Sequence, residues 1–132
     1  MIFDTSYSDK KTTRQINEVV GMPYLWKDRW KMGGIGSNRM AIEDISEEYQ
    51  KYLNAEHYLS QANIELRPKG IIVHFRYKLQ AYAWIMPFEA LQIVYNKFLT
   101  LNAAGKFVIF SKGIEQKFIN KMITAHQSYL YA

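Results

Sequence analysis

The spacing of hydrophobic residues changes twice along this chain, from a helical pattern to strict alternation and back to a helical pattern. In the first part, Ile16, Val19 and Val20 lie at positions i, i+3 and i+4. Gly21, with Pro23 just beyond it, is typical of the end of a helix. The pattern therefore predicts a short helix that ends at Gly21.

A second helical stripe predicts a helix over residues 39–53. Its apolar positions are Ile42, Ile45, Tyr49, Tyr52 and Leu53. Glu43 and Asp44 would lie near the positive end of the helix dipole, with Ser37 or Asn38 as the N-cap.

From about residue 62 the apolar and polar residues alternate, which is the period of β-strands. We expect six strands, over residues 63–67, 71–75, 79–86, 91–95, 98–101 and 107–110. Turn residues such as Pro68-Lys69-Gly70 separate them, and short turns between successive strands imply an antiparallel sheet.

After Gly113 the period is helical again. One stripe is formed by Ile114, Phe118, Ile119, Met122, Ile123, His126, Tyr129 and Leu130. We therefore predict a single α+β domain over residues 1–132, with a helical N-terminal segment (1–60) and a bent antiparallel sheet of about six strands closed by a C-terminal helix (61–132).

Several short motifs follow one another in a characteristic order over residues 62–131. They are the Pro68-Lys69-Gly70 turn, Ile85-Met86-Pro87-Phe88 followed by Leu91-Gln92-Ile93, and Phe118-Ile119-Asn120-Lys121-Met122 in the last helix. This order resembles the bacterial pleckstrin-homology-like (PH-like) or GRAM-like domains. That fold has seven strands in two near-orthogonal sheets, so either one strand is missing here or the N-terminal half supplies it. The resemblance implies a binding or assembly module for peptides, proteins or phosphoinositide head groups, and seldom an enzyme.

The composition excludes cysteine-based sites and shows where the positive charge of the chain lies. The chain has 132 residues, of which 48% are hydrophobic and none is cysteine, so disulfides and thiolate metal sites are excluded. Residues 1–60 carry 8 Lys and Arg against 9 Asp and Glu, whereas residues 61–132 carry 9 against 3. The second half is therefore basic, which favours contact with phosphates or anionic lipid. No secretory leader or membrane span is recognisable, and we expect a cytoplasmic protein.

The basic residues of the predicted hairpin fall at its two turns. Arg67 and Lys69 lie at one turn, and Arg76 and Lys78 lie at the next. A strand of about seven residues between them would hold the two pairs roughly 20 Å apart. We therefore expect solvated turns, without the convergence that a specific phosphoinositide site needs.

The number of residues in the second turn decides which side chains share a face. A three-residue turn would pair Phe75 with Leu79 and Val73 with Ala81. We favour this register because it keeps the apolar residues together. His74, Tyr82 and Trp84 would then form a second face, which either binds a ligand or receives the N-terminal helices; we favour the second interpretation.

The segment between the two predicted helices is rich in aromatic and basic residues. If it is helical, Trp26 and Trp30 share a face, with Lys27 and Lys31 alongside. The favoured interpretation is that both tryptophans pack against the sheet. The alternatives are an anchor for a protein partner, or contact with lipid or nucleic acid.

Residues with catalytic or metal-binding spacing are not recognisable. His57, His74 and His126 stand alone in the sequence. Glu43 and Glu47, and likewise Asp44 and Glu48, are spaced four residues apart, but no histidine accompanies them at helical spacing. Gly33-Gly34-Ile35-Gly36-Ser37 matches no phosphate-loop pattern, and we interpret it as a connector. No catalytic residue, cofactor or metal is expected.

These observations lead to three hypotheses of function. The favoured one is a non-catalytic binding or assembly module that acts through a protein partner or self-association, with Trp26, Trp30, His74, Arg76, Lys78, Tyr82 and Trp84 as candidate interaction residues. The alternative is a phosphate-directed binder of anionic lipid or nucleic acid. The least favoured is a small-molecule enzyme.

Overall fold

A computed structural model describes residues 1–53 and 60–132 of the chain. Its strands are β1 (Ile2–Asp4), β2 (Met40–Ile45), β3 (Gln61–Arg67), β4 (Gly70–Tyr77), β5 (Gln80–Pro87), β6 (Leu91–Tyr95), β7 (Leu99–Ala103) and β8 (Lys106–Lys112). Its helices are α1 (Lys10–Val20), α2 (Trp26–Met32) and α3 (Gln116–Leu130), with 3-10 helices η1 (Glu47–Tyr52) and η2 (Phe88–Ala90).

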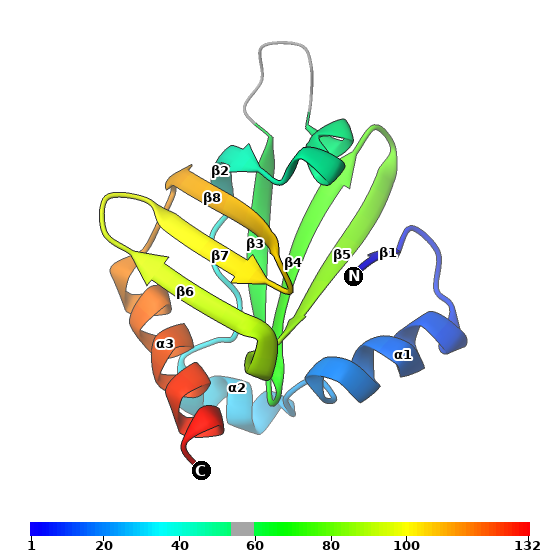
Figure 1. The fold of residues 1–132 in the computed structure, drawn as a ribbon. Helices are drawn as coiled ribbons and strands as arrows, with labels where there is room; N and C mark the ends of the chain where they lie inside the picture. Colours follow the sequence, from blue (N-terminus) through cyan, green and yellow to red (C-terminus); the bar gives the residue numbers. More distant parts are fainter. Residues whose placement is uncertain (54–59) are drawn as a thin grey trace.

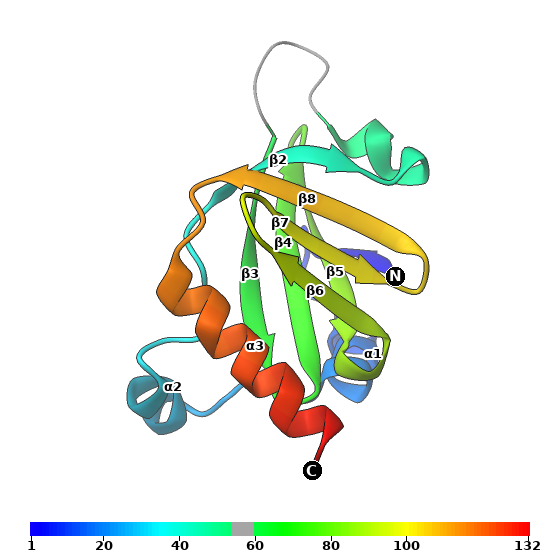
Figure 2. The ribbon, with the colours of Figure 1, turned by 60° about the vertical axis from the view of Figure 1, so that its left-hand side comes forward.

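All eight strands join one antiparallel sheet in the order β1-β5-β4-β3-β2-β8-β7-β6. The chain runs from β2 to β5 by successive pairing, and β6–β8 then return so that β8 pairs with β2. The register between β2 and β8 shifts on both sides of Ile42, and such irregularities allow a sheet to bend. Figures 1 and 2 show β6–β8 lying across β3–β5, with α3 along the open side. The α+β class, the antiparallel sheet and the closing helix are thus confirmed.

The main core lies on the inner face of this bent sheet. Alternate residues of β4 and β5, such as Val73, Trp84 and Met86, point into it, and all three are buried. From α3, Phe118 and Met122 are buried against the same cluster. The C-terminal helix is therefore part of the core.

A smaller core lies on the outer face of β4 and β5, beneath α1. Asp9 caps this helix by accepting a hydrogen bond from the Lys11 backbone nitrogen at 3.0 Å. Ile16 and Val20 are buried with Ile72, Ala83 and Ile85 of the sheet.

A glycine allows α1 to lie close to the sheet. A β-carbon at Gly70 would meet Met86 O at 2.4 Å and Val20 Cγ1 at 2.8 Å.

The predicted helix that ends at Gly21 is confirmed, because α1 ends at Val20 with Gly21 as its C-cap.

The predicted helix over residues 39–53 is wrong. Residues 40–45 form β2, which lies between β3 and β8, and only the 3-10 helix η1 follows. The Ser46 backbone nitrogen donates to Phe107 O at 3.0 Å, and Ser46 Oγ accepts from the Phe107 nitrogen at 2.6 Å. These contacts with β8 interrupt the helical pattern, because strand pairing overrides local periodicity.

The expected number of strands is also too small. The six predicted strands are present, and β1 and β2 bring the total in the described residues to eight. Both additions come from residues 1–60, so this segment is not only helical. Residue His57 lies outside the described residues.

The register that we favoured for the second turn is wrong as well. The turn between β4 and β5 has two residues, since Tyr77 pairs with Gln80. Phe75 therefore pairs with Tyr82, and Val73 with Trp84. This shift moves Trp84 to the core side of the sheet, away from His74.

Candidate functional site

A groove of about 670 Å³ lies at the end of the sheet where β4 turns into β5. It is lined by Thr5, Arg39, Tyr52, Ser60, Gln61, Ala62, Asn63, His74, Phe75, Arg76, Tyr77, Lys78, Ala81 and Tyr82. None of these lining residues is acidic. We call this hollow the outer-face groove, because α1 covers the other end of the same face.

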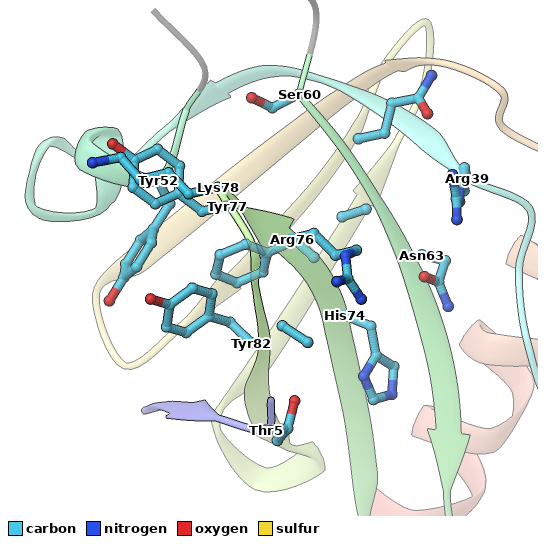
Figure 3. Close-up of a pocket in the computed structure, with 14 residues that line it drawn as sticks. Thr5, Arg39, Tyr52, Ser60, Asn63, His74, Arg76, Tyr77, Lys78 and Tyr82 are labelled. Atoms are coloured by element: carbon cyan, nitrogen blue, oxygen red, sulfur yellow. The ribbon is translucent and has the colours of Figure 1, made fainter. Parts of the chain in front are cut away.

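The strand register places the polar lining residues side by side. His74 pairs with Asn63 of β3 on one side and with Ala83 of β5 on the other. Arg76 lies two residues further along β4, opposite Ala81, and therefore on the same face as His74. Figure 3 shows His74 and Arg76 on the side of the groove that faces Asn63 and Arg39.

Behind the groove, His74 belongs to a chain of polar contacts that leads to α1. The Nε2 atom of His74 is 2.8 Å from Glu65 Oε1, and the other oxygen of Glu65 accepts from Arg67 Nε. The Nη1 atom of Arg67 donates to Asn17 Oδ1 at 2.9 Å and to Gly21 O at 2.8 Å. Since Arg67 is 8% exposed, its expected position in a solvated turn is wrong.

The charges in this series of polar contacts compensate one another. Burial by itself would raise the pKa of Glu65, but hydrogen bonds from His74 and Arg67 and the charge of Arg67 outweigh it, so the pKa is lowered. Glu65 therefore stays ionised and neutralises Arg67 inside the fold.

The cations of the groove have no such compensation. Arg39, Arg76 and Lys78 are exposed, and none forms an ion pair with a carboxylate of residues 1–53 or 60–132. These three side chains give the groove an excess of positive charge. Exposed cations around a hollow without carboxylates attract anions.

Aromatic rings lie on the other face of the same strands, which is the face that carries the main core. The Tyr52 ring lies 4.9 Å from the ring of Tyr82 and 6.0 Å from that of Tyr77, measured between centroids. Phe75 and Tyr82 are stacked at 5.4 Å. Figure 3 shows Tyr52, Tyr77 and Tyr82 grouped on this side. These rings pack against one another and against the core.

The structure thus brings together four of the seven residues that the sequence singled out. His74, Arg76, Lys78 and Tyr82 all line the groove. Trp84 does not, because it is 1% exposed and its ring meets that of Tyr49 at 4.9 Å in the core. Tyr82 pairs with Phe75 and lies on the same core side as Trp84, so the expected face of His74, Tyr82 and Trp84 is wrong.

The other two residues, Trp26 and Trp30, lie on α2. Their side chains are 80% and 82% exposed, and α2 has no buried residue. The favoured interpretation, in which both tryptophans pack against the sheet, is wrong.

Sequence reasoning missed Arg39, Asn63 and Glu65. Arg39 precedes β2, a segment whose spacing predicts a helix, so the pattern does not place Arg39 near β3. Asn63 and Glu65 could have been found, because a two-residue turn at Pro68-Lys69 places Asn63 opposite His74.

Among the residues that the structure describes, no three His, Asp or Glu side chains gather in a way that could hold a metal ion. No described helix has the length and apolar character to cross a bilayer. Comparison with protein-family models found no family that matches the chain, and comparison with curated proteins found no similar sequence.

Proposed function

We propose that this chain is a non-catalytic binding module whose outer-face groove takes a phosphate-bearing ligand. One observation carries the proposal: Arg39, Arg76 and Lys78 line a groove with no acidic residue among its described lining residues, and none of the three is paired with a described carboxylate. Arginine binds phosphate oxygens through two parallel N–H donors, and lysine acts as a point charge.

The remaining lining residues fit the same chemistry. The amide of Asn63 and the ring of His74 add hydrogen-bonding groups beside Arg76. The volume of about 670 Å³ lies within the range of small-ligand sites. Because the rings of Tyr77 and Tyr82 belong to the core face of the strands, the cations define the ligand, which is recognised by its phosphate group.

The resemblance to PH-like domains also supports a binding role. With β2, the run from β2 to β8 contains seven strands, which is the number in that fold, and α3 follows it as the closing helix. The strand β2 comes from the N-terminal half of the chain. A fold of this kind favours binding over catalysis, although fold alone does not fix function.

Titration calorimetry at low and high salt tests this proposal, with pyrophosphate, adenosine monophosphate and a short oligothymidylate as probes. We expect at least one probe to bind, with an affinity that falls steeply as salt rises. Substitution of Arg76→Ala or Lys78→Ala should weaken this binding about tenfold, because each removes a direct phosphate contact.

Lys97→Ala is the matched control, because it removes one exposed cation from the turn between β6 and β7, outside the groove. It should leave affinity within about twofold. If no probe binds at low salt, or if all three variants behave alike, the groove is not a phosphate site. Association with a protein partner or with a second copy of the chain stays a prediction. Size-exclusion chromatography of the full-length chain with light scattering tests whether it associates with itself.

A further inference from the structure

The turn before α2 and the helix itself expose a group of large apolar side chains. Met22 is 70% exposed, Leu25 62%, Trp26 80% and Trp30 82%. We call these four residues the α2 surface. Exposed single hydrophobic residues are ordinary, but two tryptophans and two aliphatic residues within nine positions form a patch that marks an interaction site.

The α2 surface is held firmly by the fold. Tyr24 packs against the main core, and Arg29 Nε donates to Tyr24 O at 2.9 Å. At the other end of α2, Gly33 adopts a left-handed conformation, and Lys121 Nζ of α3 donates to Gly34 O at 2.9 Å. The two tryptophans therefore project from an anchored helix, and a partner would meet a preorganised surface.

Basic residues stand beside the two tryptophans along α2. Within α2, Lys27, Arg29 and Lys31 stand against the single carboxylate of Asp28. Apolar side chains within a basic border complement a surface that is apolar inside and anionic outside.

Three kinds of occupant could cover such a surface. A second copy would bring the same lysines face to face, which disfavours a twofold contact. Specific protein interfaces are shape-complementary and closely packed over about 800 Å² from each partner. A lipid surface needs neither a shaped pocket nor a large area. Tryptophan and lysine are the residues that favour the boundary between head groups and acyl chains.

We infer that the α2 surface docks on a bilayer that contains anionic phospholipid. Trp26 and Trp30 insert at the level of the head groups, and Lys27 and Lys31 contact lipid phosphates. The outer-face groove stays free in this arrangement. The eight residues of β4 separate Gly70, beside the end of α1, from Tyr77 at the groove, a span of roughly 25 Å. The docked protein can therefore hold a ligand away from the lipid surface.

Sedimentation with vesicles tests the inference on the full-length chain. The probes are vesicles of phosphatidylcholine alone and of phosphatidylcholine with phosphatidylglycerol. We expect binding to the mixed vesicles at least tenfold tighter than to phosphatidylcholine, together with a blue shift of tryptophan fluorescence. Trp84, which is 1% exposed, supplies a constant background to that signal.

Two double variants separate the contributions of the two residue types. Trp26→Ala with Trp30→Ala should weaken binding to the mixed vesicles at least tenfold and abolish the blue shift. Lys27→Glu with Lys31→Glu should remove the preference for phosphatidylglycerol. Leu79→Ala is the matched control, because Leu79 is 91% exposed in the turn between β4 and β5 and lies outside both surfaces.

Each remaining outcome decides against the inference. Absence of binding to the mixed vesicles overturns it, and so does binding that the double tryptophan variant leaves unchanged. If Arg76→Ala with Lys78→Ala abolishes vesicle binding while the tryptophan variant retains it, the groove and not α2 contacts lipid. Tryptophan-dependent dimers without lipid would assign the α2 surface to self-association.

Discussion

The outer face of β3–β5 has two halves. Each half carries an arginine, which is buried and paired in one half and exposed and unpaired with any described carboxylate in the other. In the half under α1, Arg67 is buried and bonded to Glu65, Asn17 and Gly21. In the other half, Arg76 is exposed in the groove without a described carboxylate partner. A single helix accounts for the difference, because α1 covers only the first half.

The comparison teaches how one sheet face can serve both stability and binding. A cation under a helix must be paired, since an unpaired buried charge is very costly. A cation beyond the end of the helix keeps its water and needs no partner, so its charge is available to a ligand. His74 lies at the boundary, because it contacts Glu65 and also lines the groove.

The largest expected effect compares the two arginines. Arg67→Ala should lower the free energy of unfolding by about 3 kcal/mol, because it leaves Glu65 without its main partner in a largely buried position. Arg76→Ala should change that free energy by no more than about 0.5 kcal/mol. Urea denaturation at pH 7 measures both. Equal effects would mean that the two halves do not differ as described.

The pH dependence of stability sharpens the same comparison. Because the pKa of Glu65 is lowered from its ordinary value of 4.5, its contribution is present above that value and is lost as the pH falls through the folded-state pKa. Glu65→Gln should cost about 2 kcal/mol at neutral pH, and the difference from the wild type should shrink below pH 4.5. Urea midpoints between pH 7 and pH 3 test this, and a difference that stays constant with pH would contradict it.

The smallest effect concerns the turn at the open half. Lys78 has φ of 55°, a left-handed conformation that asparagine adopts more readily than lysine. Lys78→Asn should therefore raise the free energy of unfolding by about 0.5 kcal/mol, while it weakens binding in the groove. Lys97→Asn, at a turn residue without positive φ, is the control and should not stabilise. A loss of stability in Lys78→Asn would show that the turn depends on the lysine side chain.

Several elements could be predicted because their signals are local. The turn at Pro68-Lys69 and the strands beside it appear where the alternation places them. The helix α3 follows its stripe, and His126 lies half-buried at its edge, with Nε2 3.1 Å from Phe88 O. In these segments the local period and the tertiary environment require the same conformation.

Other features could not be predicted, because contacts with distant residues decide them. The stripe from Ile42 to Leu53 fits a helix by spacing, yet β8 and β3 convert its first half into a strand. In the turn at Lys78, one residue fewer moves Trp84 from the outer face to the core. The predicted face of His74, Tyr82 and Trp84 is wrong for that reason.

The sequence by itself determined the α+β class, the antiparallel order of the later strands, the closing helix and the basic character of the second half. Each of these follows from period, turn residues or charge, which act over a few neighbouring positions. Only the tertiary structure decided which cations are paired, where the groove opens and that Trp26 and Trp30 face outward. Those properties depend on what covers each surface, and here one helix of eleven residues covers half of a sheet face and leaves the other half open.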